Sequence, residues 1–248
     1  MAVATNPWRL ALYREAAGRL NDFCNRFLSP YCLDCRRVIA RLPEARDEDF
    51  ELLDGIYPGC CHRGAGDIFR LEGQPPGRDR LAPELIAGLR EARDELLSEN
   101  GFSPPGGYTI RRLRDKEVLP GTHCRYFSEH GCRLGDLKGP LCLDFVCPPI
   151  RSDLLALCEG DDSLVGPEND FLLFYRLLAA ISWDPPAAAW AEMEAFQRRL
   201  GKLVRHCRDF LRCHVSDSLS EYFDRKSGSG SDRNSKDVIS AFDRSDGF

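Results

Sequence analysis

Eight of the twelve cysteines in this chain lie in two groups whose spacing suits metal binding. The first group is a Cys-x2-Cys followed by a Cys-Cys pair, and the second has four cysteines separated by seven, nine and four residues. A thiolate is a soft, charged ligand favoured by zinc and by iron, and a two-residue gap lets two sulfurs of one turn reach the same metal. These residues therefore predict a centre that holds an iron–sulfur cluster or zinc. In chain order they are Cys32, Cys35, Cys60, Cys61, Cys124, Cys132, Cys142 and Cys147.

Both groups lie among residues that break regular structure. Pro30 and Pro58-Gly59 precede the pairs of the first group, while Gly131, Gly139-Pro140 and Pro148 flank members of the second. Turns present side chains at sharp bends, a setting that a cysteine packed in a core does not need. The setting therefore favours ligands over buried thiols.

The Cys60-Cys61 pair bears on the number of metals. Adjacent side chains diverge by about 100° in a helix and point to opposite faces in a strand, so the two sulfurs do not easily share one tetrahedral ion. We therefore expect two metals, or a cluster plus a second role. Eight thiolates suffice for two four-cysteine zinc sites or for one four-iron cluster with ligands to spare. His62 and His123 flank these cysteines and could replace a sulfur, although a histidine beside a turn is more often simply exposed.

The remaining four cysteines are expected in the core. Free cysteine commonly behaves as a small buried hydrophobe, and these four lie on predicted helices. His206 and His214 accompany two of them on the last helix, where residues two turns apart cannot chelate one ion without a third element. The four are Cys24, Cys158, Cys207 and Cys213.

The second group resembles that of a known family, the bacterial zinc- or iron-chelating cysteine-cluster proteins of YkgJ type. The resemblance covers roughly Pro30 to Pro149 and implies metal chelation. The first group of this chain departs from the family pattern. Family members keep their first cysteines close to the Cys-Cys pair, whereas here 24 residues (36 to 59) separate Cys35 from Cys60. A flagellin lysine methylase has a similar pattern, so the resemblance also implies protein lysine methyl transfer as a further alternative. The matching segments are Cys124-Arg-Tyr-Phe, Gly131-Cys132-Arg-Leu, Pro140-Leu-Cys142 and Asp144-Phe-Val-Cys147.

Composition limits the partners and the compartment. The 34 basic and 39 acidic residues give a formal net charge of −5, which argues against broad binding to nucleic acid or to an anionic membrane. Arg9, Arg14 and Glu15 fall where a signal peptide would be apolar, and the longest apolar stretch, 171–183, contains Arg176 and is too short to span a bilayer. We therefore expect a cytoplasmic protein with reduced thiols.

Apolar residues recurring at spacings of three and four predict the helices that must position the cysteines. Tyr108–Ile110 and Glu117–Leu119 are expected to pair as a short hairpin. Ser29-Pro30 is expected to end the first helix just before Cys32. The expected helices run from near Pro7 to Phe27, over 50–56, 81–96, 153–158 and 171–181, and from Pro185-Pro186 to about His214.

Together these patterns predict a mainly α fold with an irregular, loop-rich core centred on cysteines and metal, at most a short β-hairpin, and a C-terminal helical hairpin or bundle. Residues 1–214 are expected to form one metal-centred domain, with the cysteine cluster at 30–149 and a helical part at 150–214. Residues 215–248, rich in Ser, Gly and Asp, are expected to form a flexible tail. The predicted function is metal binding with a redox or metal-dependent catalytic role, and the sequence identifies no substrate. The alternative is a structural zinc module that binds a protein partner.

Overall fold

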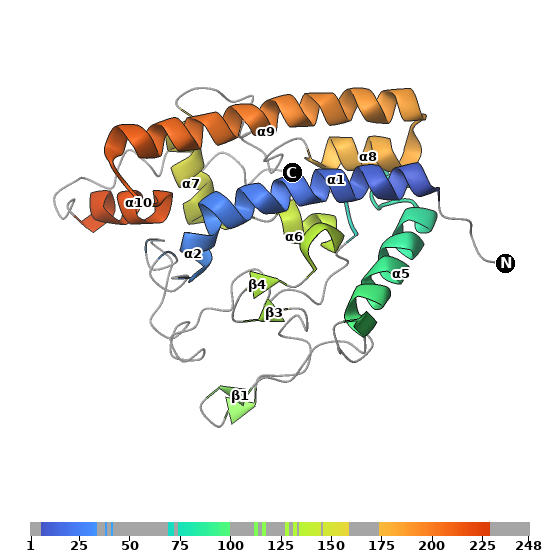
Figure 1. Ribbon diagram of the computed structural model, residues 1–248, viewed down its shortest axis with the longest axis horizontal. Coiled ribbons are helices and arrows are strands. Elements are labelled where there is room, and N and C mark those ends of the chain that lie inside the picture. Colours follow the sequence, from blue (N-terminus) through green and yellow to red (C-terminus); the bar gives the residue numbers. More distant parts are fainter. Residues whose placement is uncertain are drawn as a thin grey trace.

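The computed structural model describes residues 6–33, 38, 41, 69–71, 74–99, 112–113, 116–117, 127–128, 131–132, 134–144, 146–158 and 174–228. Helices account for most of these residues, which confirms the expected mainly α fold. Two long helices, α1 (Pro7–Phe23) and α9 (Pro186–His214), run side by side, and α8 (Phe174–Trp183) packs against both (Figure 1). Within the described ranges, no helix is both long enough and apolar enough to cross a membrane.

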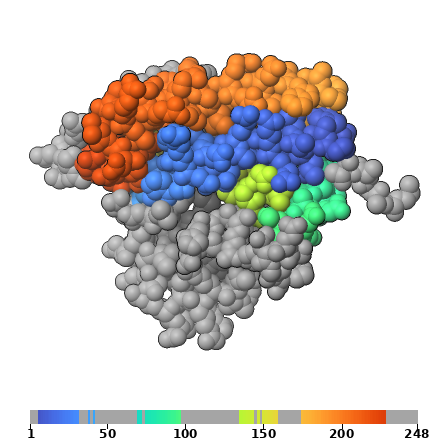
Figure 2. All heavy atoms as spheres, viewed as in Figure 1, coloured from blue at the N-terminus to red at the C-terminus, as the bar shows by residue number. Residues whose placement is uncertain are grey.

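Helix α1 lies at the centre of the described helices. Besides α8 and α9, it contacts the 3-10 turn η3 (Gly135–Leu137), α5 (Pro83–Glu99) and α6 (Pro140–Asp144). Figure 2 shows the atoms of α6 and α5 lying directly below those of α1, with α9 along its other side. Its buried residues recur at the helical spacing that places them on one face. They are Leu12, Tyr13, Ala16, Ala17, Leu20 and Phe23.

The chain stays helical beyond the point where the sequence predicted a break. After α1 it continues as a π-helix, η1 (Cys24–Leu28), and then as α2 (Ser29–Leu33). The expectation that Ser29-Pro30 ends the helix was therefore wrong. The π-helix shifts the hydrogen bonding, so that the N–H of Ser29 donates to the carbonyl of Cys24. Pro30 then occupies the first turn of α2, where a missing N–H is tolerated.

Helix α5 confirms the expected helix over 81–96. The chain enters it through a turn in which the N–H of Leu71 donates to the carbonyl of Asp79 at 2.7 Å, and that of Leu81 to Phe69 at 3.1 Å. The apolar residues Leu85 and Leu89 are buried. The helix expected over 50–56 lies outside the described residues.

Two small antiparallel hairpins are present. Strands β1 (Arg112–Leu113) and β2 (Lys116–Glu117) pair within the region of the expected hairpin, with Arg112 opposite Glu117. Of the expected strands themselves, Tyr108–Ile110 lies outside the described residues. A second hairpin, which the sequence did not indicate, pairs β3 (Phe127–Ser128) with β4 (Gly131–Cys132).

Helix α7 (Pro148–Leu157) begins five residues before the expected start at Asp153. Pro148 and Pro149 occupy its first two positions, where proline's fixed φ favours a helix and its missing N–H has no consequence. The start of α7 is therefore fixed immediately after Cys147.

The C-terminal helices include one that was not expected. Helices α8 and α9 confirm the predicted helices, and the apolar face of α9 is buried from Ala189 to Cys207. Beyond Val215 the chain forms α10 (Leu219–Gly228), which buries Leu219 and Phe223, so the expected flexible tail was wrong over these residues. Residues 229–248 lie outside the described part.

Candidate metal centre

The eight predicted ligands differ in how far the structure describes them. Cys142 lies in α6 with an exposed side chain, and Cys147 is partly buried immediately before α7. Cys32 lies in α2 and Cys132 in β4, where the structure describes the backbone alone. Four further predicted ligands, and the alternative ligands His62 and His123, lie outside the described residues. The four are Cys35, Cys60, Cys61 and Cys124.

Cys147 occupies the N-cap position of α7. Its φ of −63° and ψ of 151° are extended, its carbonyl accepts the N–H of Arg151 at 3.0 Å, and its side chain does not cap the helix. A helix N-terminus carries a partial positive charge that stabilises a thiolate. The position therefore suits an ionised sulfur ligand.

Cys142 lies near the buried face of α1. The fully buried Tyr13 donates its hydroxyl hydrogen to the carbonyl of Lys138. Burial raises the pKa of Tyr13 well above its ordinary value, and a negative charge on Cys142 raises it further, while Arg93 acts in the opposite direction. Cys142 and the buried Arg93 therefore both lie within electrostatic range of the Tyr13 hydroxyl.

Polar contacts hold η3, between Cys132 and Cys142, against α1. Arg14 pairs with Asp136 at 2.7 Å, and Lys138 Nζ donates to Asn21 Oδ1 at 2.6 Å. The backbone of α1 at Gly18 lies close to Asp136, because a Cβ added there would make an ordinary van der Waals contact of 3.7 Å with the Cβ of Asp136. Helix α1 therefore supports the segment from Gly135 to Asp144, which carries Cys142.

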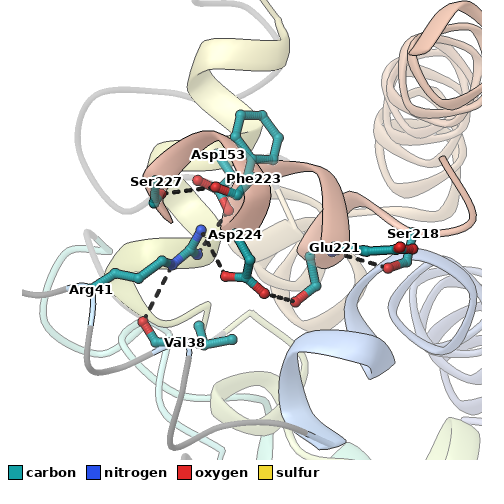
Figure 3. A network of polar contacts seen from close by, with 9 residues as sticks. Val38, Arg41, Asp153, Ser218, Glu221, Phe223, Asp224 and Ser227 are labelled. Carbon is teal, nitrogen blue, oxygen red and sulfur yellow. Dashed lines mark hydrogen bonds and ion pairs between the residues drawn. The ribbon is translucent and has the colours of Figure 1, made fainter. Parts of the chain in front are cut away.

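A largely buried cluster of charges contains Arg41, which lies six residues after Cys35 (Figure 3). The Arg41 guanidinium contacts Asp153 of α7 at 2.8 Å and Asp224 of α10 at 3.7 Å, and its Nε donates to the carbonyl of Val38 at 3.4 Å. The side chains of Arg41, Asp153 and Asp224 are only 15%, 12% and 11% exposed. We call these three residues the Arg41 cluster. One guanidinium therefore joins the segment after Cys35 to two helices.

Tyr31, next to Cys32, packs against the Arg41 cluster. Its ring centroid lies 5.8 Å from the guanidinium carbon of Arg41, within range of a cation–π contact. Burial raises the pKa of Tyr31 above its ordinary value, and the nearby Asp153 carboxylate raises it further. Burial also raises the pKa of Asp153, and this outweighs the opposite effect of Arg41. The cluster is therefore poorly hydrated, and its charges depend on one another.

The four cysteines expected in the core are placed differently from one another. Cys158 and Cys207 are buried as expected, and Cys24 is partly buried against the core. Cys213 is exposed, so its expected burial was wrong. The last turn of α9 has passed the end of the core, and His214 there is also exposed and stacks on Phe210 at 4.2 Å.

Among the described residues, no group of three or more His, Cys, Asp or Glu could hold a metal ion. Only Cys142 and Cys147, of the eight predicted ligands, have side chains in that set. Comparison with models of known families, with curated proteins and with solved structures finds no match to this chain.

Proposed function

We propose that this chain binds an iron–sulfur cluster or zinc through the thiolates of its eight clustered cysteines, with a redox or metal-dependent catalytic role. The observation that carries the proposal is the spacing of the second group, in which four cysteines follow one another among turn residues. An irregular core centred on the cysteines, completed by C-terminal helices, belongs to the same proposal. So does a cytoplasmic location, which would keep the thiols reduced.

The described surroundings of two ligands support the proposal. Cys147 lies at a helix N-terminus, and the exposed Cys142 lies on α6, which packs against α1. A helix N-terminus favours the ionised thiol that a soft metal requires. Where a buried cysteine is surrounded by apolar groups, as at Cys207, the pKa rises to about 12 and metal binding is disfavoured.

Anaerobic purification followed by measurement of iron, zinc and acid-labile sulfide tests the proposal. The expected result is stoichiometric iron with sulfide, or stoichiometric zinc. Colourless protein with zinc and no sulfide would exclude the iron–sulfur cluster, and unfolding on removal of that zinc would select the structural alternative. Protein without either metal would contradict the proposal. Methyl transfer stays a prediction from the resemblance.

Serine variants identify the ligands. Cys142→Ser and Cys147→Ser are expected to lower the metal content, because a hydroxyl replaces a thiolate poorly on a soft metal. Cys213→Ser matches the exposure of Cys142, and Cys24→Ser matches the partial burial of Cys147. These two controls are expected to retain full metal. Equal metal content in all four variants would refute the ligand assignment.

A further inference from the structure

The second half of helix α9 has a basic outer face, although the chain as a whole is acidic. Between residue 198 and the end of the helix at His214, the sequence has six arginine or lysine residues and one carboxylate, Asp209. Five of the six basic side chains are exposed, and that of Arg199 is partly exposed. We call these six residues the α9 basic face. They are Arg198, Arg199, Lys202, Arg205, Arg208 and Arg212.

The buried side of α9 determines where these charges lie. The apolar residues from Ala189 to Cys207 pack into the core, and the helix contacts α1 and α8. Arg198, Arg205 and Arg212 follow one another at intervals of seven residues, which is nearly two turns. They therefore form a row on the opposite side of the helix that is about 21 Å long at the helical rise. Figure 2 shows α9 along the upper edge of the described helices, where such a row meets solvent.

Carboxylates of the described chain neutralise little of this charge. Arg198 pairs with Glu194 at 3.6 Å, but both side chains are 71% exposed, and water screens a pair as exposed as this one. No described carboxylate pairs with Arg205 or Arg212. With six basic residues and the single Asp209, the stretch from 198 to 214 has a formal charge of +5. A surface with this charge attracts a polyanion.

The chemistry of the face favours one class of polyanion. A helix that lies on an anionic membrane inserts large apolar side chains, and protein interfaces usually have aromatic or apolar side chains at their centre. The α9 basic face has neither, because the nearest exposed apolar side chains in the sequence, Trp190 and Val215, lie beyond its two ends. Five of its six members are arginines, whose planar guanidinium binds two phosphate oxygens at once. A phosphate backbone therefore fits this face better than a membrane or an acidic protein does.

We propose that the α9 basic face binds the phosphates of duplex DNA without sequence specificity. The major groove of B-DNA is about 12 Å wide and admits an α-helix. Arg199 and Arg208 are nine residues apart, about two and a half turns, so they flank the row on its two sides and face the phosphates on either side of the groove. The net charge of −5 confines the contact to this face, so the Kd is that of non-specific binding, about 1 to 100 µM at physiological salt. This binding does not depend on the proposed metal centre.

Two full-length variants change the charge of the face in opposite directions. Arg198→Gln/Arg205→Gln/Arg212→Gln removes the charge of the row, and glutamine retains a favourable helix propensity. Asp209→Asn removes the acidic residue beside the row. Circular dichroism verifies that both variants keep the native helix content.

The matched control is Arg70→Gln/Arg78→Gln/Arg90→Gln. These three exposed arginines lie in α5 and in the turn that precedes it, on the other side of α1 from α9. The control changes the net charge by the same amount as the variant of the row. It therefore separates an effect of the α9 basic face from an effect of total charge.

The fluorescence anisotropy of a labelled duplex DNA of about 24 base pairs measures the Kd at pH 7 between roughly 50 and 200 mM NaCl. For wild type, log Kd should rise linearly with log salt concentration, because binding releases counterions from the DNA. The variant of the row should bind at least about 10-fold more weakly at the lowest salt, and its slope should fall by about 3, one for each arginine. Asp209→Asn should bind several-fold more tightly, and the control should keep the wild-type Kd.

Three outcomes would overturn the inference. The first is wild-type protein that does not bind the duplex at the lowest salt. The second is equal weakening in the variant of the row and in the control, since the effect would then follow the net charge. The third is wild-type binding to vesicles of phosphatidylserine and phosphatidylcholine but not to the duplex, which would assign the face to a membrane surface. Metal content, measured on the same preparations, should be equal in all variants, so the proposed function is tested separately.

Discussion

Replacement of Arg41 by Met is expected to destabilise the native state strongly. The substitution removes the positive charge and leaves Asp153 and Asp224 as two carboxylates, both only slightly exposed, without their shared partner. The formal charge of the Arg41 cluster changes from −1 to −2. Removing one partner of a buried ion pair typically lowers the free energy of unfolding by about 3 to 5 kcal/mol, because the remaining charge stays desolvated. In a chain of this size that corresponds to a fall in Tm of about 6 to 20 °C.

Urea denaturation at pH 7, followed by circular dichroism at 222 nm, measures this loss. Arg176→Met serves as control, because Arg176 pairs with Glu192 at 3.0 Å with side chains that are 64% and 24% exposed, and such a pair contributes about 0 to 1 kcal/mol. Adding Asp153→Asn and Asp224→Asn to Arg41→Met should recover most of the lost stability. A loss in Arg41→Met no larger than in the control would refute the reasoning, since it would mean that water screens the Arg41 cluster.

The destabilisation should also depend on pH, and the raised pKa of Asp153 determines the direction of this dependence. Burial raises the folded-state pKa of Asp153 above the ordinary value of 3.8, so the native state binds the proton more tightly than the unfolded chain does. Ionising Asp153 therefore lowers stability as pH rises from 3.8 through the folded-state pKa. Without Arg41 this pKa rises further. The difference between wild type and Arg41→Met should accordingly shrink as pH falls from 7 towards 4, and a constant difference would contradict the assignment.

Two further predictions concern α9. Val215→Gly should raise the free energy of unfolding by about 0.5 to 1 kcal/mol, because Val215, 88% exposed, has a φ of 47° that a β-branched residue adopts with strain. Thermal unfolding measures this change. The control is Asp217→Gly, in the same turn but without a positive φ, which should lower the free energy of unfolding instead. In native protein at pH 8, Cys207 should resist alkylation, because burial, helped by Cys158, raises its pKa to about 12, whereas the exposed Cys213 should react. Mass spectrometry distinguishes the two thiols, and equal labelling would contradict the burial of Cys207.

Helices with a regular apolar stripe could be predicted from the sequence. Helices α5 and α9 follow their stripes because burial of one face supplies most of a helix's stability in a folded protein. Cys213 was expected in the core because it lies on a predicted helix and free cysteine is commonly buried, but neither signal defines where burial ends along α9. Whether a residue at helical spacing is covered depends on which element lies opposite, and periodicity carries no such information.

The start of helix α10 carries capping residues that the average composition of the C-terminal region does not reveal. The Ser, Gly and Asp content of the C-terminal region favoured a flexible tail. Yet Ser218 and Glu221 have the spacing of a capping box, and the N–H of Glu221 donates to Ser218 Oγ at 3.1 Å. Leu219 and Phe223 follow four residues apart and are both buried. At a helix start, specific capping residues are therefore more informative than the average composition around them.

The residues of the candidate site likewise differ in whether the local sequence or a tertiary contact reveals them. The cysteines could be found from sequence because ligand chemistry depends on residue type and on spacing within a turn. Arg41 could not, because its partner Asp153 is 112 residues away and arginine is abundant throughout the chain. Arg36 and Arg37 directly follow Cys35 in the sequence, whereas Arg41 lies six residues after it and pairs with carboxylates. An arginine that joins two elements, as Arg41 joins α7 and α10, pairs with residues that are distant in the sequence. Such an arginine is therefore found from tertiary contacts and not from the sequence.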